Sequence, residues 1–140
     1  MKKTVLFLCV NNSARSQMAE GIVNHYLKDK LSAFSAGSKP TLVNPYAIEV
    51  MREIGIDISH HRSKPVSEFF GKEFDYVITV CGDSERDTSC PVFLGKVKYN
   101  LHFPFPDPAE ATGGPEQIKN AFRKVRDQIK NQLEQWANSL

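Results

Sequence analysis

The stretch that decides the fold runs from Val5 to Leu27 and reads VLFLCVNNSARSQMAEGIVNHYL. It begins with an uninterrupted apolar run over residues 5–8, which is typical of a strand buried on both faces of a parallel sheet. It ends with apolar residues at helical spacing, which form one stripe of Met18, Ala19, Ile22, Val23, Tyr26 and Leu27. A short polar loop joins the two parts. The stretch therefore predicts a strand, a tight loop and a helix.

The rest of the chain repeats this alternation of strand and helix. The expected elements are a strand over 33–36, a helix from Pro45 to Ile54, a strand over 76–80, a weaker strand over 97–101 and a helix that starts near Pro115. Elements that alternate at these lengths predict a single α/β domain over residues 1–140, with a four-stranded parallel sheet flanked by helices on both faces. Ligands of such sheets bind beyond the carboxyl ends of the strands.

The composition is that of a globular protein with almost no net charge. Of the 140 residues 41% are hydrophobic, and 18 Lys and Arg against 16 Asp and Glu give a net charge of +2. A charge this small argues against a protein that covers nucleic acid or an anionic membrane. The apolar run from Val5 to Val10 is shorter than the roughly 18 residues of a membrane span, and two asparagines directly follow it. We therefore expect a cytoplasmic monomer that has neither nucleic acid nor a membrane as its partner.

A thiol and a guanidinium flank the first loop. Cys9 ends the strand and Arg15 opens the helix, with five residues between them. A loop this short can turn its backbone N–H groups around one small anion, and the helix N-terminus adds partial positive charge. The guanidinium can hold two oxygens of a tetrahedral oxyanion. The residues expected to bind this oxyanion are Val10, Asn11, Asn12, Ser13, Ala14 and Arg15.

The same electric field favours the ionised form of the Cys9 sulfur. A free thiol is mostly protonated at neutral pH, whereas thiols at helix N-termini beside cations are far more readily ionised. The hydroxyls of Ser13 and Ser16 are placed to donate hydrogen bonds to a thiolate. An inert cysteine buried at the end of the strand is the alternative, which the polar loop disfavours. We predict that one loop both binds the oxyanion and carries the nucleophile.

Cys9, Arg15 and Ser16 after a first strand resemble the signature of the low-molecular-weight protein tyrosine phosphatases. The continuation SQMAEG, residues 16–21, is similar to the thioredoxin-coupled arsenate reductases built on that fold. The likeness runs nearly end to end, through SAG at 35–37, GIDIS at 55–59, the Cys81 segment and Asp107-Pro108. It implies a low-molecular-weight phosphatase-like fold and the reduction of arsenate to arsenite in arsenic detoxification, without a metal or organic cofactor.

Two further cysteines stand near the third predicted strand. Cys81 ends that strand and so shares a sheet edge with Cys9, and Cys90 follows after eight residues without a large apolar side chain. We expect the segment 82–89 to be exposed and only marginally stable. A zinc site is disfavoured because the spacing is too long for a ligand pair. Burial in a strand explains an inert Cys81 but not Cys90. The resemblance implies that Cys81 and Cys90 form a redox disulfide.

The proline-rich loop from His102 to Pro108 presents Asp107 at the same sheet edge. Attack by Cys9 on an oxyanion must expel an oxygen, which leaves more readily when it is protonated. A solvated Asp-Pro turn is the alternative, and the resemblance implies that Asp107 is the general acid. In phosphatases of this fold an aromatic-bearing segment follows this motif. Residues 109–114 contain no aromatic side chain here, which favours a small inorganic substrate.

The resemblance implies a relay of three thiols. Cys9 attacks arsenic, Cys81 then attacks the Cys9 sulfur and releases arsenite, and Cys90 draws the disulfide outward to Cys81. Thioredoxin is the expected reductant, and a glutaredoxin and glutathione route stays open. The alternative function is a low-molecular-weight protein tyrosine phosphatase that uses Cys9, Arg15 and Asp107. A regulator that binds arsenic or phosphate without turnover is a third hypothesis.

One departure from the family pattern concerns a cation site. Some relatives bind potassium beside the first loop, through residues that match Asn12, Glu20 and Ser35 together with a carboxylate. Lys64 stands where that carboxylate is expected. An ammonium group there can take the place of the cation. We therefore expect no bound metal, and an activity that does not respond to potassium.

Overall fold

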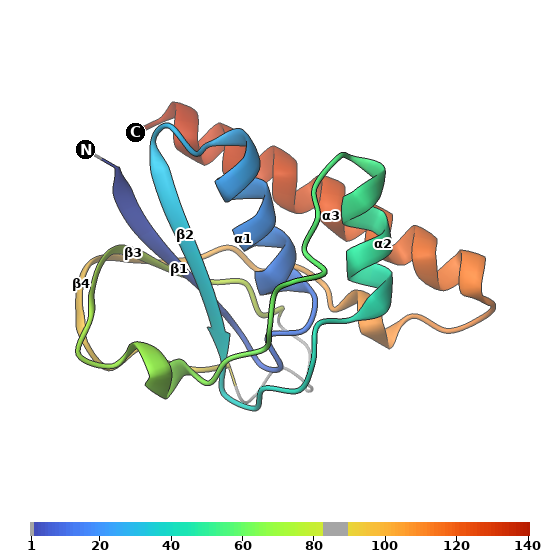
Figure 1. Ribbon diagram of the computed structural model, residues 1–140, viewed down its shortest axis with the longest axis horizontal. Helices are drawn as coiled ribbons and strands as arrows, with labels where there is room; N and C mark the ends of the chain where they lie inside the picture. Colours follow the sequence, from blue (N-terminus) through green and yellow to red (C-terminus); the bar gives the residue numbers. More distant parts are fainter. Residues whose placement is uncertain (1, 83–89) are drawn as a thin grey trace.

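A parallel sheet of four strands forms the centre of the protein, in the order β2-β1-β3-β4. The computed structural model (Figure 1) describes residues 2–82 and 90–140. The strands are β1 (Lys3–Cys9), β2 (Leu31–Gly37), β3 (Glu73–Thr79) and β4 (Lys96–His102). The aliphatic strand β1 lies in the interior of the sheet, where it pairs with β2 along its whole length and with β3 from Val5 to Leu8. The predicted parallel sheet is confirmed.

Three α-helices cover one face of the sheet. They are α1 (Arg15–Tyr26), α2 (Pro45–Glu53) and α3 (Pro115–Asn138). α3 packs against both α1 and α2, and the buried residues of all three form one core with Val5 and Phe7. The start of α2 follows from its sequence, because the Asn44 side chain accepts a hydrogen bond from the Tyr46 N–H at 2.8 Å and Pro45 occupies the first turn. Among the described residues, no helix is long and apolar enough to cross a membrane.

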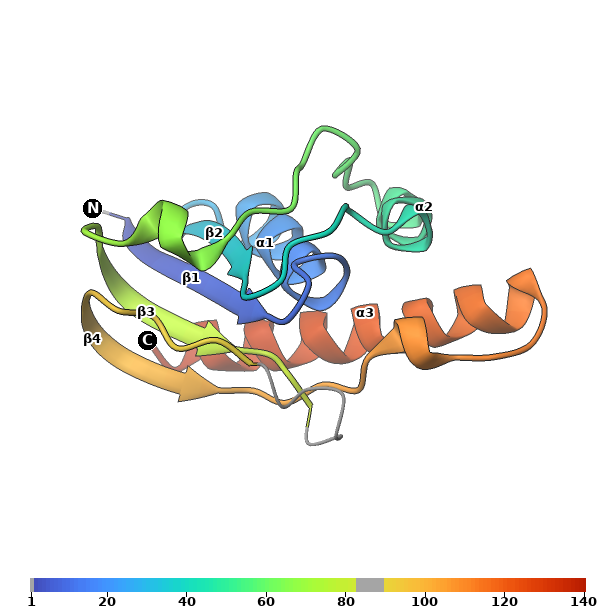
Figure 2. The same cartoon turned by 90° about the horizontal axis from the view of Figure 1, so that it is seen from below.

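A short 3₁₀ helix and a loop cover the other face. The helix η1 (Val66–Phe69) brings Phe69 into a smaller core with Leu6 and Leu8, and Phe93 from the segment before β4 joins that core. In Figure 2, η1 crosses in front of β1 while α1 lies behind it. The expected flanking by helices on both faces is met only in part, because the three α-helices share one face and η1 on the other is a single 3₁₀ turn. The sequence does not predict η1, because a single turn leaves no periodic pattern.

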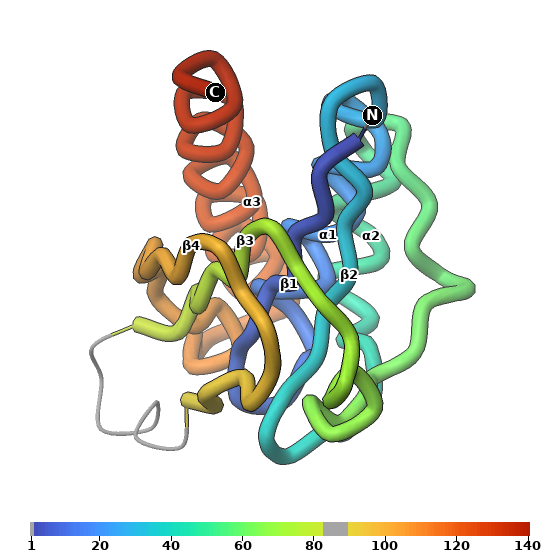
Figure 3. Tube along the Cα trace, turned by 90° about the vertical axis from the view of Figure 1, so that its left-hand side faces the viewer, coloured from blue at the N-terminus to red at the C-terminus, as the bar shows by residue number. Residues whose placement is uncertain are grey.

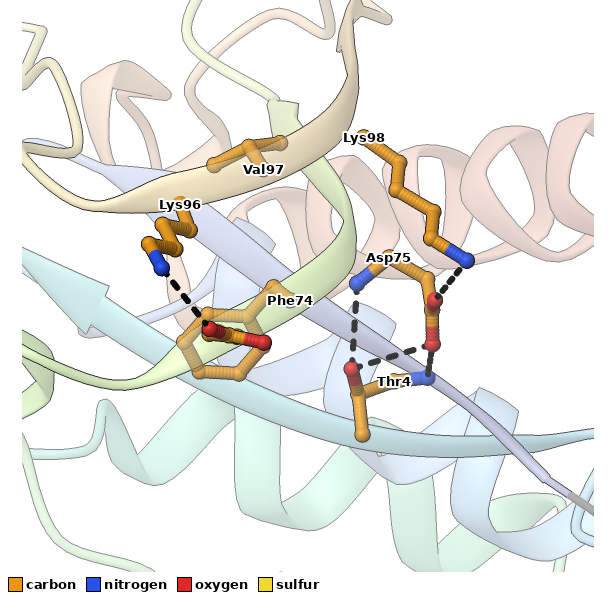
Figure 4. Close-up of a pocket in the computed structure, with 7 residues that line it drawn as sticks. Thr4, Phe74, Asp75, Lys96, Val97 and Lys98 are labelled. Carbon is orange, nitrogen blue, oxygen red and sulfur yellow. Dashed lines mark hydrogen bonds and ion pairs between the residues drawn. The ribbon is translucent and has the colours of Figure 1, made fainter.

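The two ends of the sheet differ in character. Both termini lie at one end, and the loop from β1 to α1 lies at the other (Figures 1 and 3). A cavity of about 280 Å³ opens at the amino ends of β1, β3 and β4 (Figure 4). Its charged groups are paired with one another, with Lys96 at 3.5 Å from Glu73, Lys98 at 3.5 Å from Asp75, and Asp75 accepting the Thr4 N–H at 2.8 Å. These contacts engage the charged groups in joining neighbouring strands. The reactive residues are therefore expected at the other end of the sheet, where the strands have their carboxyl ends.

Candidate active site

The loop of residues 10–14 is held from outside by the segment that follows β2. Three N–H groups of that segment donate to loop carbonyls, namely Lys39 to Val10 at 2.8 Å, Thr41 to Asn11 at 3.3 Å and Asn44 to Ser13 at 2.9 Å. In a planar trans peptide the carbonyl and the following N–H point in opposite directions. The N–H groups of these peptide units therefore turn toward the inside of the loop. This is the arrangement that an anion cradle requires.

Gly37 lets the end of β2 approach the loop closely. A Cβ atom at this position would lie 2.5 Å from the Val10 carbonyl oxygen and 2.9 Å from the Asn12 nitrogen. Both are backbone atoms, so no side-chain rotation relieves the contact. The Gly37 N–H also donates to the Lys64 carbonyl at 2.9 Å. Glycine at this position thus allows the strand end and the loop to pack backbone against backbone.

The loop encloses a small polar pocket. Its volume is about 30 Å³, and its lining residues are Cys9, Asn11, Ser13, Ala14, Arg15, Asp107 and Ala109. A cavity needs roughly 10–15 Å³ to hold one water molecule, so this pocket has room only for a small group. Cys9 is a free thiol with only 2% of its surface exposed. It lies at the N-terminus of α1, where no side chain caps the helix.

Arg15 and Asp107 both line the pocket, with their side chains close together. The Arg15 guanidinium is 4% exposed, with Nη1 donating to the Phe105 carbonyl at 3.1 Å and Nη2 lying 3.8 Å from Asp107 Oδ2. Asp107 caps the short helix η3 (Pro108–Glu110), because its Oδ1 accepts the Ala109 N–H at 3.0 Å. Oδ2 therefore faces Arg15 while Oδ1 is held by the backbone. The predicted acid and the predicted guanidinium thus share one small cavity with the thiol.

A directed chain of hydrogen bonds ends at the Cys9 sulfur. The Lys64 backbone N–H donates to Asn12 Oδ1 at 3.0 Å, which fixes the orientation of that amide. Asn12 Nδ2 then donates to Ser16 Oγ at 2.7 Å. Because Ser16 Oγ accepts this bond, its own proton is available for Cys9 Sγ, 2.8 Å away. An ionised sulfur has no proton to give, so with Cys9 as a thiolate Ser16 is the donor and the sulfur the acceptor. Asn12 adopts a left-handed backbone, with φ of 49°, which asparagine tolerates better than most residues.

Gln17 is a buried residue that the sequence analysis missed. Its Nε2 donates to Asn12 Oδ1 and to the Arg62 carbonyl, each at 2.9 Å, and its Oε1 lies 2.9 Å from His61 Nδ1. Ser63 Oγ also donates to the Asn12 carbonyl at 2.8 Å. Burial lowers the pKa of His61 below its ordinary range, against the opposing pull of Glu20. These contacts join residues some forty-five positions apart, so no local pattern could have predicted them.

The four positions assigned to a cation site do lie together. Lys64 Nζ donates to the Arg62 carbonyl at 3.0 Å and lies 3.8 Å from Glu20 Oε1. That same carboxylate oxygen accepts a hydrogen bond from Ser35 Oγ at 2.7 Å. Burial lowers the pKa of the Lys64 ammonium, and the Glu20 charge opposes this effect. The side chain of Lys64 thus extends into the space among Glu20, Ser35 and the loop.

Cys81 and Cys90 are joined by a disulfide, with their Cα atoms 6.1 Å apart. Cys81 is 1% exposed and its Sγ lies 4.0 Å from the carbonyl oxygen of Leu8, the residue before Cys9. The two sulfur-bearing segments are therefore adjacent at the carboxyl end of the sheet. The predicted exposure of segment 82–89 falls mostly on residues 83–89, which lie outside the described residues. Within the described residues, no group of three or more His, Cys, Asp or Glu side chains is arranged to hold a metal.

The structure brings most of the predicted site residues to one place. Cys9, Arg15, Asp107 and the loop residues Asn11, Ser13 and Ala14 all line the pocket. Val10 and Asn12 do not line it. Val10 belongs to the core, and the fully buried Asn12 side chain orients Ser16 instead of facing the pocket. Ala109 lines the pocket although the sequence analysis did not name it as a site residue, because the turn of η3 folds it back over the loop.

The chain is similar to known proteins along nearly its whole length. Residues 4–140 match the family described as low molecular weight phosphotyrosine protein phosphatase. An arsenate reductase from Shouchella clausii is 41% identical over 138 residues, which cover 99% of this chain and 97% of the relative. A solved structure described as an arsenate reductase in the phosphate binding state superposes with a TM-score of 0.79 at 34% identity, covering 99% of this chain and 98% of the other.

A further solved structure is a thioredoxin-dependent arsenate reductase from Corynebacterium glutamicum. It superposes with a TM-score of 0.67 at 30% sequence identity. The match covers 99% of this chain and 64% of the longer protein.

Proposed function

The chain belongs to the low molecular weight phosphotyrosine protein phosphatase family, and we propose that within it the protein is an arsenate reductase, which converts arsenate to arsenite through three cysteines. The observation that carries this function is the disulfide between Cys81 and Cys90, next to a free thiol in an oxyanion pocket. A phosphatase of this fold needs the thiol and the pocket but has no use for two further redox sulfurs. Reduction of a pentavalent oxyanion through a thiol relay needs the pocket with its thiol and also the two further sulfurs.

The first step that we propose uses the pocket residues. Arsenate binds among the loop N–H groups, with Arg15 holding two of its oxygens. The Cys9 thiolate attacks arsenic, and Asp107 gives a proton to the oxygen that leaves as water. The product is a covalent bond between the Cys9 sulfur and arsenic, which is still pentavalent. Ser16 supports this step because its hydroxyl, 2.8 Å from the sulfur, stabilises the attacking thiolate.

The next step transfers electrons from sulfur to arsenic, and the step after it moves the resulting disulfide outward. The Cys81 thiolate attacks the Cys9 sulfur, a disulfide forms, and the electron pair of the sulfur–arsenic bond passes to arsenic, which leaves as trivalent arsenite. The Cys90 thiolate then attacks the Cys81 sulfur and releases the Cys9 thiolate. The position of Cys81 Sγ, 4.0 Å from the carbonyl next to Cys9, supports the first of these exchanges. The disulfide in the structure corresponds to the product of the second.

The last step needs an external reductant. We propose thioredoxin, because a protein dithiol can reduce the outer disulfide by thiol exchange alone, and because a relative with this fold is described as thioredoxin-dependent. The reaction belongs to arsenic detoxification. We propose that it takes place in the cytoplasm, where thiols are kept reduced, and that the chain acts as a monomer.

The direct test is a coupled assay with arsenate, thioredoxin, thioredoxin reductase and NADPH. We expect NADPH to be consumed over many turnovers, with arsenite appearing in equal amount. The same assay with glutaredoxin and glutathione should be much slower. Hydrolysis of an aryl phosphate would not distinguish the functions, because both use the same pocket. Hydrolysis without any multiple-turnover arsenate reduction would leave the phosphatase as the function, and tight binding without either reaction would indicate a regulator.

A further inference from the structure

An apolar ridge follows the outer cysteine directly. The side chains after Cys90 alternate, with Pro91 and Phe93 buried and Val92 and Leu94 exposed. Among the exposed large apolar residues that the structure describes, these two have the largest exposed fractions, 75% for Val92 and 68% for Leu94. Alternation of this kind lets an extended segment anchor itself by one side while it presents the other to solvent. We call Val92 and Leu94 the ridge.

A groove lies beside the ridge on the sheet face that η1 covers in part. Its volume is about 240 Å³, and it is lined by Leu8, Val77, Thr79, Pro91, Val92, Phe93, Asn100, Leu101 and His102. The floor comes from β1, β3 and β4, and the wall comes from the segment after Cys90, which runs back along this face toward the start of β4 (Figure 2). The ridge and the groove thus form one surface that begins at the disulfide.

Access to the disulfide determines where a reductant must sit. The Cys81 side is 1% exposed, whereas Cys90 is partly exposed. An attacking thiolate therefore reaches the Cys90 sulfur, and any protein that carries this thiolate must cover the surroundings of Cys90. Extended chain advances about 3.3–3.6 Å per residue, so Val92 lies within about 7 Å of Cys90 and Leu94 within about 14 Å along the backbone.

A contact of the size expected for a redox partner extends over the ridge. Transient redox partners bury less than about 1,200 Å² in total, or about 600 Å² on each protein. A round patch of about 600 Å² has a radius of about 14 Å, so a partner centred on Cys90 covers Val92 entirely and reaches Leu94. The centre of such an interface is normally apolar and depleted of charge, as is the sequence from Cys90 to Leu94.

We propose that the ridge of Val92 and Leu94, with the groove beside it, is the docking surface for a protein dithiol reductant of the thioredoxin type. This inference rests on the proposed function. The partner's thiolate attacks the Cys90 sulfur, a mixed disulfide forms, and Cys81 leaves as a thiolate. The partner's second thiol then attacks the partner's own sulfur in the mixed disulfide. This step releases the Cys90 thiolate and leaves the partner oxidised, with a disulfide between its two thiols. Apolar side chains of the partner, around its attacking thiol, would pack on the ridge.

The test separates docking from chemistry by changing the reductant. The double variant Val92→Ser, Leu94→Ser is compared with wild type and with the control Leu140→Ser, which removes a half-exposed apolar side chain from the chain terminus at the opposite end of the sheet. The rate of arsenate reduction is measured against thioredoxin concentration and, separately, with dithiothreitol. Both replaced residues are exposed, so the fold should be retained.

We expect the thioredoxin concentration at half-maximal rate to rise about tenfold in the double variant and to stay unchanged in the control, since most contact residues cost less than about fivefold when truncated and two losses of about threefold multiply to about tenfold. The rate with dithiothreitol should be the same in all three proteins. An unchanged thioredoxin dependence in the double variant would overturn the docking surface. So would wild-type turnover with glutaredoxin but not with thioredoxin. Absence of arsenate reduction by wild type even with dithiothreitol would instead refute the proposed function.

Discussion

At the scale of single residues, the reactivity of Cys9 depends on the direction of its hydrogen bonds. The sulfur belongs to a residue that is almost completely buried. The chain from the Lys64 N–H through Asn12 to Ser16 supplies a donor that faces the sulfur. The uncapped N-terminus of α1 and the Arg15 guanidinium add positive charge on the same side. The buried sulfur therefore faces a hydroxyl, a helix N-terminus and a guanidinium.

The replacement Ser16→Ala tests this donor. A hydrogen bond to a charged group contributes about 1.5–3 kcal/mol, so its loss should slow alkylation of Cys9 by iodoacetamide at neutral pH about tenfold or more. The rate should recover at alkaline pH, where the thiol ionises without help. Of the two hydroxyls expected to donate to the thiolate, only that of Ser16 lies within hydrogen-bond distance of the sulfur in the described structure, so Ser13→Ala, in the same pocket, serves as the matched control. Equal pH profiles for Ser16→Ala and wild type would show that Ser16 does not stabilise the thiolate.

Sequence spacing predicts the residues that line the pocket but not those that hold them in place. Cys9, Arg15 and Asp107 each follow or precede a recognisable strand or helix end, so the topology of a parallel sheet is enough to bring them together. The orienting contacts of Gln17 with residues 61 and 62 depend on how an irregular segment packs on α1. No periodicity encodes such a contact. For Asn12, anion contact stays a prediction for the backbone N–H, while its buried side chain orients Ser16, a role that loop position alone does not reveal.

At the scale of elements, the loop between β1 and α1 keeps its shape through backbone contacts with the end of β2. The three N–H groups of residues 39–44 hold the loop carbonyls outward, and Gly37 permits the approach. The pocket is therefore built by two strand ends and not by the loop alone. A change in β2 should affect oxyanion binding as strongly as a change in the loop.

The replacement Gly37→Ala tests the contribution of β2. The added Cβ would collide with the Val10 carbonyl oxygen and the Asn12 nitrogen, so the loop must move outward. We expect affinity for inorganic phosphate, measured by calorimetry as a stand-in for arsenate, to fall at least tenfold. Gly55→Ala is the control, since Gly55 has a positive φ of 80° but open space around it. That variant should lose stability while binding phosphate normally. Normal phosphate binding by Gly37→Ala would show that the loop shape does not depend on β2.

The segment that carries Lys64 supports the loop from the other side. Its ammonium group faces Glu20 and the Arg62 carbonyl, so a positive charge already fills the space among the oxygen atoms. We expect the arsenate reduction rate to be equal in potassium and sodium salts at the same ionic strength. Lys64→Ala should open this space and make the rate respond to potassium. A several-fold activation of wild type by potassium would contradict this account.

The larger elements follow from the sequence more closely than the small ones. The predicted helix from Pro115 and the helix from Pro45 begin where the structure has them, because proline and an N-cap mark a helix start and an apolar stripe marks its buried face. β3 begins at Glu73, three residues before the predicted start, since its first residues include the charged Glu73 and Asp75 at the paired amino end. At that end the strands are held by ion pairs, so the hydrophobic pattern that marks a strand is absent from the first residues of β3.

At the scale of the whole molecule, stability should fall on the acid side partly through His61. Burial lowers its pKa below the value near 6.5 of an unfolded chain. The unfolded chain then binds a proton before the folded protein does, so this contribution to stability is complete above about pH 6.5 and is lost as pH falls below it. The groups that face the ring are Glu20, Gln17, His60 and Lys64.

The replacement His61→Gln keeps a hydrogen-bonding group beside Gln17 but cannot take up a proton. We expect the free energy of unfolding of wild type, measured with urea, to fall more steeply between about pH 7.5 and 5.5 than that of the variant. His60→Gln, beside the same segment, is the control and should follow wild type. Parallel curves for wild type and His61→Gln would show that His61 does not titrate differently in the folded protein.

The whole molecule combines a small polar pocket with two further sulfurs at the edge of the same sheet, and the central claim is that electrons enter this pocket through Cys81. The most direct measurement uses Cys90→Ser, reduced, treated once with arsenate, and digested without reductant for mass spectrometry. The account predicts a disulfide-linked peptide pair that contains Cys9 and Cys81, with one arsenite formed per protein. Formation of arsenite without that link, or no arsenite while Cys9 is alkylated normally, would contradict it.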